Sequence, residues 1–91
     1  MSEITEQILF SGRVQGVGFR QTTNRIAAGL PVRGFVRNLP DRRVEVIVTG
    51  TALSIQRLIA GLREYFHSGI TDIDRQAIDA PEDFQRFEVR S

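Results

Sequence analysis

The stretch Ser11-Gly12-Arg13-Val14-Gln15-Gly16-Val17-Gly18-Phe19-Arg20 ends an alternating apolar run and opens a helical pattern. Gly16 and Gly18 tolerate positive φ angles, which lets consecutive backbone N–H groups converge on one point. Arg20 falls in the first helical turn, where its guanidinium can add a bidentate, charge-assisted contact. The stretch therefore predicts a cradle for a tetrahedral anion such as phosphate at a strand-to-helix junction.

The elements on either side of this turn follow from hydrophobic periodicity. Residues Gln7–Val14 alternate and predict a strand with Ile8 and Phe10 on one face. After the turn, helical spacing predicts a helix of about three turns, with Gly29 and Pro31 as stop signals. Its repeating positions are Phe19, Thr23, Ile26, Ala27 and Leu30.

A β-hairpin is predicted next along the chain. Its strands are Val32–Asn38 and Arg43–Thr49, and Leu39–Arg42 supplies the turn between them. The second strand places three valines on one face, at positions Val44, Val46 and Val48. Phe35 is expected to serve as core or rim packing.

The last third of the chain predicts a second helix and two strands. Thr51 is a suitable N-cap, and Gly69 follows the end of the helix. Strands are expected at Ile70–Asp79 and Phe84–Arg90, separated by the turn Ala80–Asp83. The expected buried stripe of the helix is Ile55, Leu58, Ile59, Leu62 and Phe66.

The order of elements, β-α-β-β-α-β with a short final strand, predicts the fold class. Helices separated by a hairpin in this way pack on one face of an antiparallel sheet, which is the α+β, ferredoxin-like sandwich. A chain of 91 residues has room for one domain, expected over residues 1–91.

Composition excludes several classes of partner and chemistry. Twelve basic residues, all of them arginine, against eleven acidic ones give a net charge of +1, so neither nucleic acid nor a membrane surface is an expected partner. With no cysteine and one histidine, we expect no metal and no cofactor. The acidic N-terminus lacks a signal-peptide pattern, which predicts a cytoplasmic protein. One core accounts for the apolar residues, so a monomer is expected.

Two phosphate-binding motifs do not fit the turn. A Walker A loop ends in Gly-Lys-Ser/Thr, whereas this chain has Gly18-Phe19-Arg20. A dinucleotide fingerprint needs a third glycine where Gln21 stands. Nucleotide binding is therefore not favoured.

Two stretches closely resemble the signatures of the small acylphosphatases. These are Val14–Arg20 and Gly34–Asn38, and the resemblance continues through Val44–Val46 to the closing Phe84–Val89. Two independent motifs at the right separation are more specific than one short pattern. The resemblance covers nearly the whole chain.

This resemblance implies an activity and a set of site residues. The family hydrolyses acyl phosphates, small-molecule substrates, to a carboxylate and inorganic phosphate by direct in-line attack of water, without a metal or a phosphoenzyme. By resemblance, Arg20 is the substrate-binding arginine and Asn38 the residue that orients the attacking water. The backbone amides implied in phosphate binding are those of Gln15, Gly16, Val17, Gly18, Phe19 and Arg20.

The residue chemistry is compatible with that reaction. Phosphoryl transfer asks a protein mainly for positioning and for stabilisation of charge on the equatorial oxygens. A departing carboxylate is a weak base and needs little protonation, so an asparagine can suffice without a strong acid or base.

Three alternatives remain open. The first is a catalytically weak module of the same fold that binds phosphate or another anion. The second is the acylphosphatase-like domain of the hydrogenase maturation carbamoyltransferases, although 91 residues leave no room for the attached transferase domains. The third is an RNA-binding ferredoxin-like domain, which the lack of aromatic residues in Arg43–Thr49 disfavours.

The chain departs from the family pattern at two turns. Asp41-Arg42 replaces the usual Asp-Gly of the hairpin, and a non-glycine residue held there at positive φ costs about 1 kcal/mol unless the turn relaxes to another type. Pro31 stands where a glycine commonly follows the first helix, which shifts the expected left-handed C-cap to Gly29.

Overall fold

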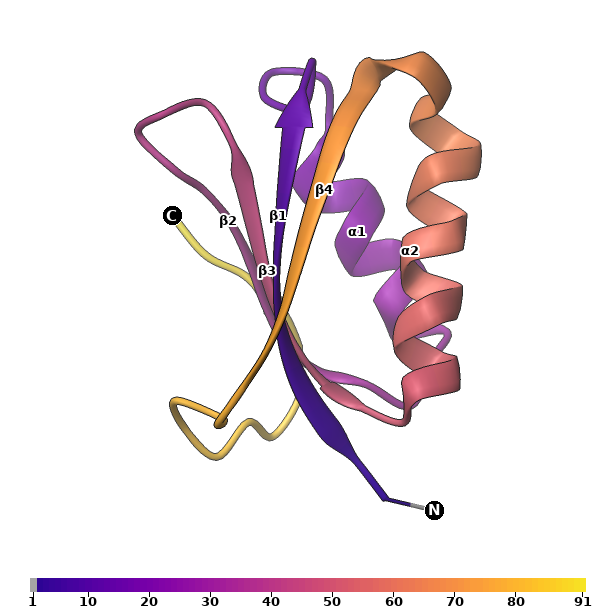
Figure 1. Cartoon of the computed structure of the whole chain (residues 1–91), viewed down its shortest axis with the longest axis vertical. Coiled ribbons are helices and arrows are strands. Elements are labelled where there is room, and N and C mark those ends of the chain that lie inside the picture. Colours follow the sequence, from indigo (N-terminus) through magenta and orange to yellow (C-terminus); the bar gives the residue numbers. More distant parts are fainter. Residues whose placement is uncertain (1) are drawn as a thin grey trace.

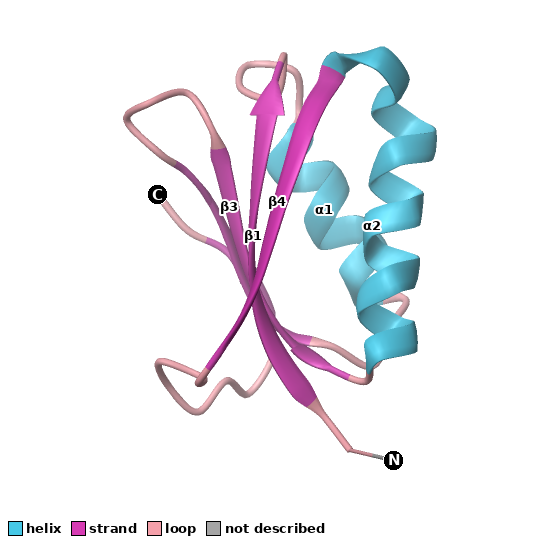
Figure 2. Ribbon diagram, in the orientation of Figure 1, coloured by secondary structure: helices cyan, strands magenta, loops and turns pink. Residues whose placement is uncertain are grey.

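A computed structural model describes residues 2–91 as one five-stranded sheet with two helices on one of its faces (Figures 1 and 2). The strand order is β4-β1-β3-β2-β5, and β1 lies between β4 and β3. The elements are β1 (Ile4–Gly12), α1 (Phe19–Ala28), β2 (Arg33–Asn38), β3 (Val44–Gly50), α2 (Ala52–Phe66), the 3₁₀ turn η1 (His67–Gly69), β4 (Ile70–Ile78) and β5 (Phe87–Val89).

The predicted fold class is confirmed. Strands β4, β1, β3 and β2 pair antiparallel, as a ferredoxin-like sheet requires. The short β5 runs parallel to β2, a direction that the sequence pattern does not predict, so the complete sheet is mixed. No helix among residues 2–91 has the length and apolar character needed to cross a membrane.

The strand boundaries differ most from the sequence prediction at β1 and β5, and by one residue at one or both ends of the other strands. β1 begins at Ile4 rather than Gln7, because Thr5 and Glu6 belong to the strand ladder although their polarity hides the alternation. Glu6 is buried and accepts two hydrogen bonds from Arg75 of β4. β5 covers only Phe87–Val89, because only these residues are in register with β2.

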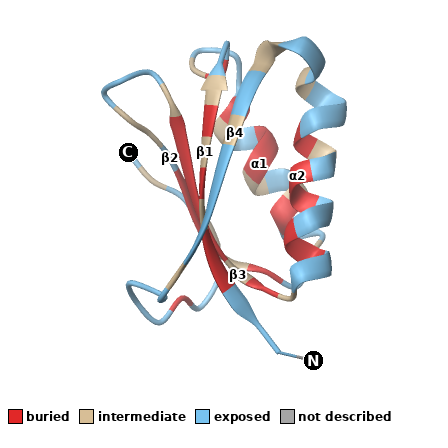
Figure 3. Cartoon of the chain, in the orientation of Figure 1, coloured by how far each residue is buried: buried red, intermediate tan, exposed pale blue. Residues whose placement is uncertain are grey.

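The main core lies between the sheet and the helices, where the buried residues line the facing surfaces (Figure 3). The predicted alternation is confirmed, since Ile8 and Phe10 on β1 are fully buried. The ring of Phe19 lies 5.1 Å from that of Phe10 and 4.7 Å from that of Phe66, measured between centroids. Other members of this core are Val44, Val46, Val48, Ile55, Leu58, Ile59 and Leu62.

A smaller apolar cluster packs separately from the main core. It consists of Phe35, Ile47 and Phe84, with Ile78 packed against it. The rings of Phe35 and Phe84 meet edge to face, with centroids 5.9 Å apart. This contact holds the segment between β4 and β5 against the sheet and confirms that Phe35 is a packing residue.

Among the helix ends and turns, the structure agrees with the prediction at Thr51 and differs from it at Gly29. Thr51 caps α2 as predicted, because its Oγ1 accepts a hydrogen bond from the backbone N–H of Ser54 at 3.2 Å. Arg42 keeps a positive φ of 76°, so the hairpin turn holds the strained conformation instead of relaxing. The predicted left-handed C-cap at Gly29 is wrong, because the φ angle of Gly29 is −90°. Helix α1 ends instead with hydrogen bonds from the backbone N–H groups of residues 29 and 30 to the carbonyl oxygens of Ile26 and Ala27.

Glycine is required at position 34 because β2 and β3 approach closely there. Gly34 has φ +143°, and a Cβ atom would lie 1.9 Å from the carbonyl oxygen of Ile47. We expect Gly34→Ala to lower the free energy of unfolding by about 3 kcal/mol or more, since the contact is with backbone that cannot move aside. Gly29→Ala is the matched control: its φ is −90° and the nearest atom would be 3.6 Å away. Urea unfolding of both variants measures the difference, and similar losses would contradict the steric account.

Candidate active site

The segment between β1 and α1 forms an open loop at residues 13–18, at the same end of the sheet as the β2–β3 hairpin turn (Figure 1). Gly16 has φ 76°, and Gly18, the N-cap of α1, has φ 79° and ψ 20°. A side chain at either glycine would meet no atom within 4 Å. These glycines are therefore required by backbone geometry and not by crowding.

The backbone donors of this loop are unused by the protein. Across residues 2–91, no backbone or side-chain acceptor takes a hydrogen bond from the amides of residues 15–21. The first bond of α1 instead runs from the N–H of Thr22 to the carbonyl of Gly18, at 3.0 Å. Unpartnered N–H groups and the partial positive charge of a helix N-terminus together favour a bound anion.

A pocket of about 250 Å³ opens beside the loop. It brings Arg20 from α1 and Asn38 from the end of β2 to one cavity. Its lining residues are Val14, Gly16, Gly18, Phe19, Arg20, Gln21 and Asn38.

The pocket lining and the predicted site differ at four positions. Val17 is 40% exposed and lines a different hollow with Arg13 and Phe66, and Gln15 is absent from the pocket lining. Val14 and Gln21 line the pocket although the sequence does not predict them as site residues. A glutamine in the first turn of a helix carries no distinguishing sequence signal, so only its position in space reveals it.

The charge of Arg20 is not neutralised by a neighbouring carboxylate. Its Nη1 donates to the carbonyl oxygen of Arg90 over a long 3.4 Å contact, and it takes part in no ion pair within the described part of the chain. By contrast, Arg37 pairs with Glu45 at 2.6 Å and Arg75 with Glu6 at 2.9 Å. Arg20 is therefore a half-buried cation available for an anionic ligand.

Asn38 is also available. It is the last residue of β2, where it pairs with Val44 of β3, and it is half-buried. In residues 2–91 its carboxamide makes no side-chain hydrogen bond. An amide group without an internal partner can both donate to and accept from a ligand or a water molecule.

The side chain of Gln15 has a role that the sequence did not reveal. Its Nε2 donates hydrogen bonds of 2.9 Å to the carbonyl oxygens of Leu39 and Arg43, both in the hairpin turn. The family resemblance implies a role in phosphate binding for its backbone N–H alone. The partners lie 24 and 28 residues away in the chain, which is why local pattern could not identify them.

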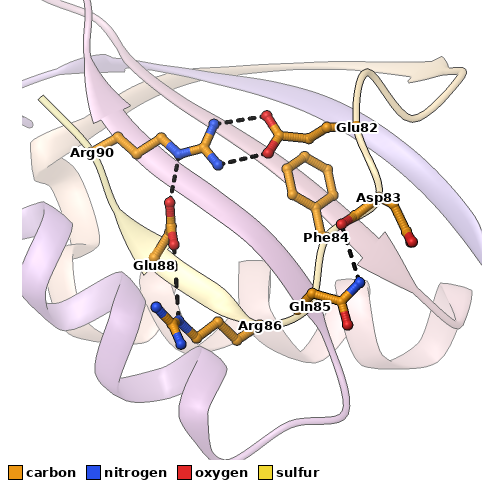
Figure 4. Close-up of a pocket in the computed structure, with 7 residues that line it drawn as sticks. All are labelled: Glu82, Asp83, Phe84, Gln85, Arg86, Glu88 and Arg90. Carbon is orange, nitrogen blue, oxygen red and sulfur yellow. Dashed lines mark hydrogen bonds and ion pairs between the residues drawn. The ribbon is translucent and has the colours of Figure 1, made fainter.

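A second pocket of about 270 Å³ lies along the segment that precedes and includes β5 (Figure 4). Its central cation is Arg90, which donates two hydrogen bonds to Glu82 and one to Glu88. The guanidinium also lies 4.3 Å from the ring centroid of Phe35. Because these charges neutralise one another, this pocket lacks the unpaired cation that the loop pocket has.

No potential metal cluster appears in the part of the chain that the structure describes. Within residues 2–91, no three His, Asp or Glu side chains gather closely enough to hold a metal ion.

The fold is that of a small α+β protein, and its loop of free backbone N–H groups beside a half-buried arginine is typical of proteins that bind an anion such as phosphate. The sequence model of the Acylphosphatase family matches residues 6–89, and the chain belongs to that family. It is an enzyme that hydrolyses acyl phosphates.

Individual relatives agree with this assignment. An acylphosphatase of Nitrosococcus oceani is 45% identical over 83 residues, which cover 90% of this chain and 92% of the relative. The crystal structure of an acylphosphatase from Bacillus subtilis matches with a TM-score of 0.84 and 29% identity, over 97% of this chain and 99% of that one. An acylphosphatase structure from Coxiella burnetii gives 0.83 and 32%, over 97% and 93%.

Arg90 and the carboxylates of Glu82 and Glu88 that it contacts form a cluster, here called the Arg90 clamp. This clamp predicts that the stability of the protein depends on pH. The hydrogen bond from Arg90 holds the pKa of Glu82 below its ordinary value of 4.5. A lowered pKa in the folded state gives a stabilisation that is complete above the ordinary pKa and is lost as the pH falls through the folded value. We expect wild type to lose more of its Tm than Glu82→Gln when the pH is lowered from about 6 to about 3.

The control is Glu64→Gln, since Glu64 is exposed on α2 and makes no ion pair within residues 2–91. This variant should follow the wild-type pH profile. If Glu82→Gln and wild type lose equal amounts of Tm on acidification, the clamp contributes nothing to stability.

Proposed function

We propose that the loop amides from Gln15 to Arg20, with the Arg20 guanidinium, hold the phosphate of an acyl phosphate while Asn38 orients the attacking water. The observation that carries this proposal is the shared pocket. Arg20 and Asn38 come from separate elements, line one cavity of about 250 Å³, and have no competing side-chain partner among residues 2–91.

The loop and Arg20 supply the positive potential. Phosphoryl transfer spreads negative charge over the equatorial oxygens of the transferring group. Because Gly16 and Gly18 adopt positive φ angles, the backbone N–H groups of the loop are already oriented before that charge develops. The guanidinium of Arg20 adds a formal positive charge in a partly buried setting, where electrostatic contacts are stronger than in bulk water.

Asn38 serves the nucleophile in this proposal. Its side-chain oxygen accepts a hydrogen bond from a water molecule and aligns the water lone pair with the phosphorus, in line with the bond to the acyl oxygen. The new P–O bond forms as the P–O(acyl) bond breaks, and its electron pair leaves with the carboxylate. One proton of the water passes to solvent or to the product phosphate. Because the carboxylate is a weak base, no general acid is needed.

The remaining features of the proposal concern partners and compartment. We infer a monomer, because the few exposed large apolar side chains come from four different parts of the chain, which are β1, the loop at residues 13–18, α2 and β5. They are Ile4, Val17, Leu53, Tyr65 and Val89. A cytoplasmic location and the absence of a nucleic-acid partner stay predictions, which cell fractionation and an RNA-binding titration test.

The first test is hydrolysis itself. Purified protein should release inorganic phosphate from acetyl phosphate or benzoyl phosphate at an undiminished rate when a chelator is present, because positive charge comes from the loop amides and Arg20. A strong loss of rate on chelation would contradict the metal-free part only. Phosphate binding without turnover would instead favour a weak anion-binding module.

Two substitutions separate the proposed roles. Arg20→Ala should raise the inhibition constant for inorganic phosphate by about 10 to 100-fold, because one charged hydrogen-bonding group contributes about that much to affinity. Asn38→Ala should lower kcat by about 100-fold or more with little change in phosphate affinity, because it misplaces only the nucleophile.

Matched controls exist for both. Arg57→Ala, on the exposed face of α2, and Asn24→Ala, the other asparagine of the chain, should leave both constants within about twofold. Equal kcat for Asn38→Ala and wild type would show that the water is oriented by another group.

A further inference from the structure

We propose that Gln15 is a positioning residue for hydrolysis, acting by fixing the phosphate loop to the hairpin that carries Asn38. The inference rests on the proposed role of Asn38 and adds a residue that touches neither the phosphate nor the water through its side chain. Gln15 directly precedes Gly16 on one wall of the pocket, and Leu39 directly follows Asn38 on the other.

One side-chain amide spans these two walls. The Nε2 of Gln15 donates to the carbonyl oxygens of Leu39 and Arg43, each at 2.9 Å. A primary amide has two N–H protons, so both are used. Among residues 2–91, these are the only hydrogen bonds that join the loop at 13–18 to the segment 38–43.

The hairpin does not need Gln15 in order to close. The N–H of Leu39 donates to the carbonyl of Arg43 at 2.8 Å, and the N–H of Arg42 donates to the carbonyl of Leu39 at 3.2 Å. Each carbonyl therefore already accepts one backbone hydrogen bond, and Gln15 occupies its second lone pair. A variant without the Gln15 donors keeps these bonds and is expected to fold.

Without this connection, no hydrogen bond among residues 2–91 would hold the two walls of the pocket at a fixed separation. The loop contains two glycines at positive φ, and the hairpin turn holds Arg42 at a φ of 76°. Asn38 pairs with Val44 at the last step of the β2–β3 ladder, and beyond it only the two backbone hydrogen bonds of the turn restrain the chain. In-line attack depends steeply on the position of the water, and a displacement of about 1 Å costs about 100-fold in rate. The Gln15 side chain is placed to prevent that displacement.

The test uses Gln15→Met, which keeps the length of the side chain and removes both donors. We expect kcat for benzoyl phosphate to fall by about 10 to 100-fold, while the inhibition constant for inorganic phosphate stays within about threefold of wild type. The matched control is Gln7→Met. Gln7 is also half-buried and donates through Nε2, but to Glu45 at 2.8 Å within the sheet.

Gln7→Met removes one hydrogen bond to a carboxylate, whereas Gln15→Met removes two to carbonyl oxygens, and urea unfolding of both variants measures any general loss of stability. The kcat of Gln7→Met should remain within about twofold of wild type. An unchanged kcat for Gln15→Met, or an equal fall for Gln7→Met, would overturn the inference.

A double-mutant cycle then tests the route of action. If Gln15 acts through Asn38, Gln15→Met introduced into Asn38→Ala should lower kcat by less than about twofold further. If the fold-decreases in kcat of the two single variants multiply in the double variant, the two residues act independently. That result would overturn the positioning role of Gln15 and leave the proposed role of Asn38 intact. Wild-type kcat for Asn38→Ala would instead overturn the water-orienting role and the positioning role together.

Discussion

The packing of Phe19 between Phe10 and Phe66 is the interaction on which the site depends. Phe10 is on β1 and Phe19 is the first residue of α1, so their contact brings together the two ends of the intervening loop. Phe66, at the end of α2, covers the other side of the Phe19 ring. With both ends held by buried aromatic side chains, the loop at residues 13–18 has a fixed base although its glycines are exposed. Burial of large rings thus orients polar backbone groups that have no internal partner.

Electrostatic pairing distinguishes Arg20 from several other arginines of the chain. The guanidinium groups of Arg33, Arg37, Arg75 and Arg90 are each matched by a carboxylate. These pairs are mostly exposed and contribute little individually to stability. Their effect on the site is indirect, because acidic side chains that are engaged elsewhere do not compete with an anion for Arg20. The carbonyl of Arg90 is the only protein acceptor for Arg20 among residues 2–91, and it carries no formal charge.

Features that depend on neighbouring residues are predictable from the sequence, whereas features that depend on another strand or helix are not. Local patterns predict the Thr51 cap and the alternation of β1 correctly, because each depends on a few neighbouring residues. They leave the type of the hairpin turn open, and the structure keeps Arg42 at a positive φ. The start of β1 was placed too late, because Glu6 is made compatible with burial by Arg75 from another strand. The left-handed cap at Gly29 was also wrong, since α1 ends through backbone bonds that need no positive φ. The direction of β5 depends on its pairing with β2 and has no local signature.

The sequence by itself determined the order of the elements, the membership of the family and the presence of Gly16, Gly18, Arg20 and Asn38. Periodicity and motif spacing carry that information because side-chain direction along a helix or strand repeats regularly. Only the tertiary structure decided that Arg20 and Asn38 share one pocket and that the side chain of Gln15 reaches the hairpin. Contacts between residues from different elements depend on how the strands align in the sheet, and that alignment is set by burial of the whole core.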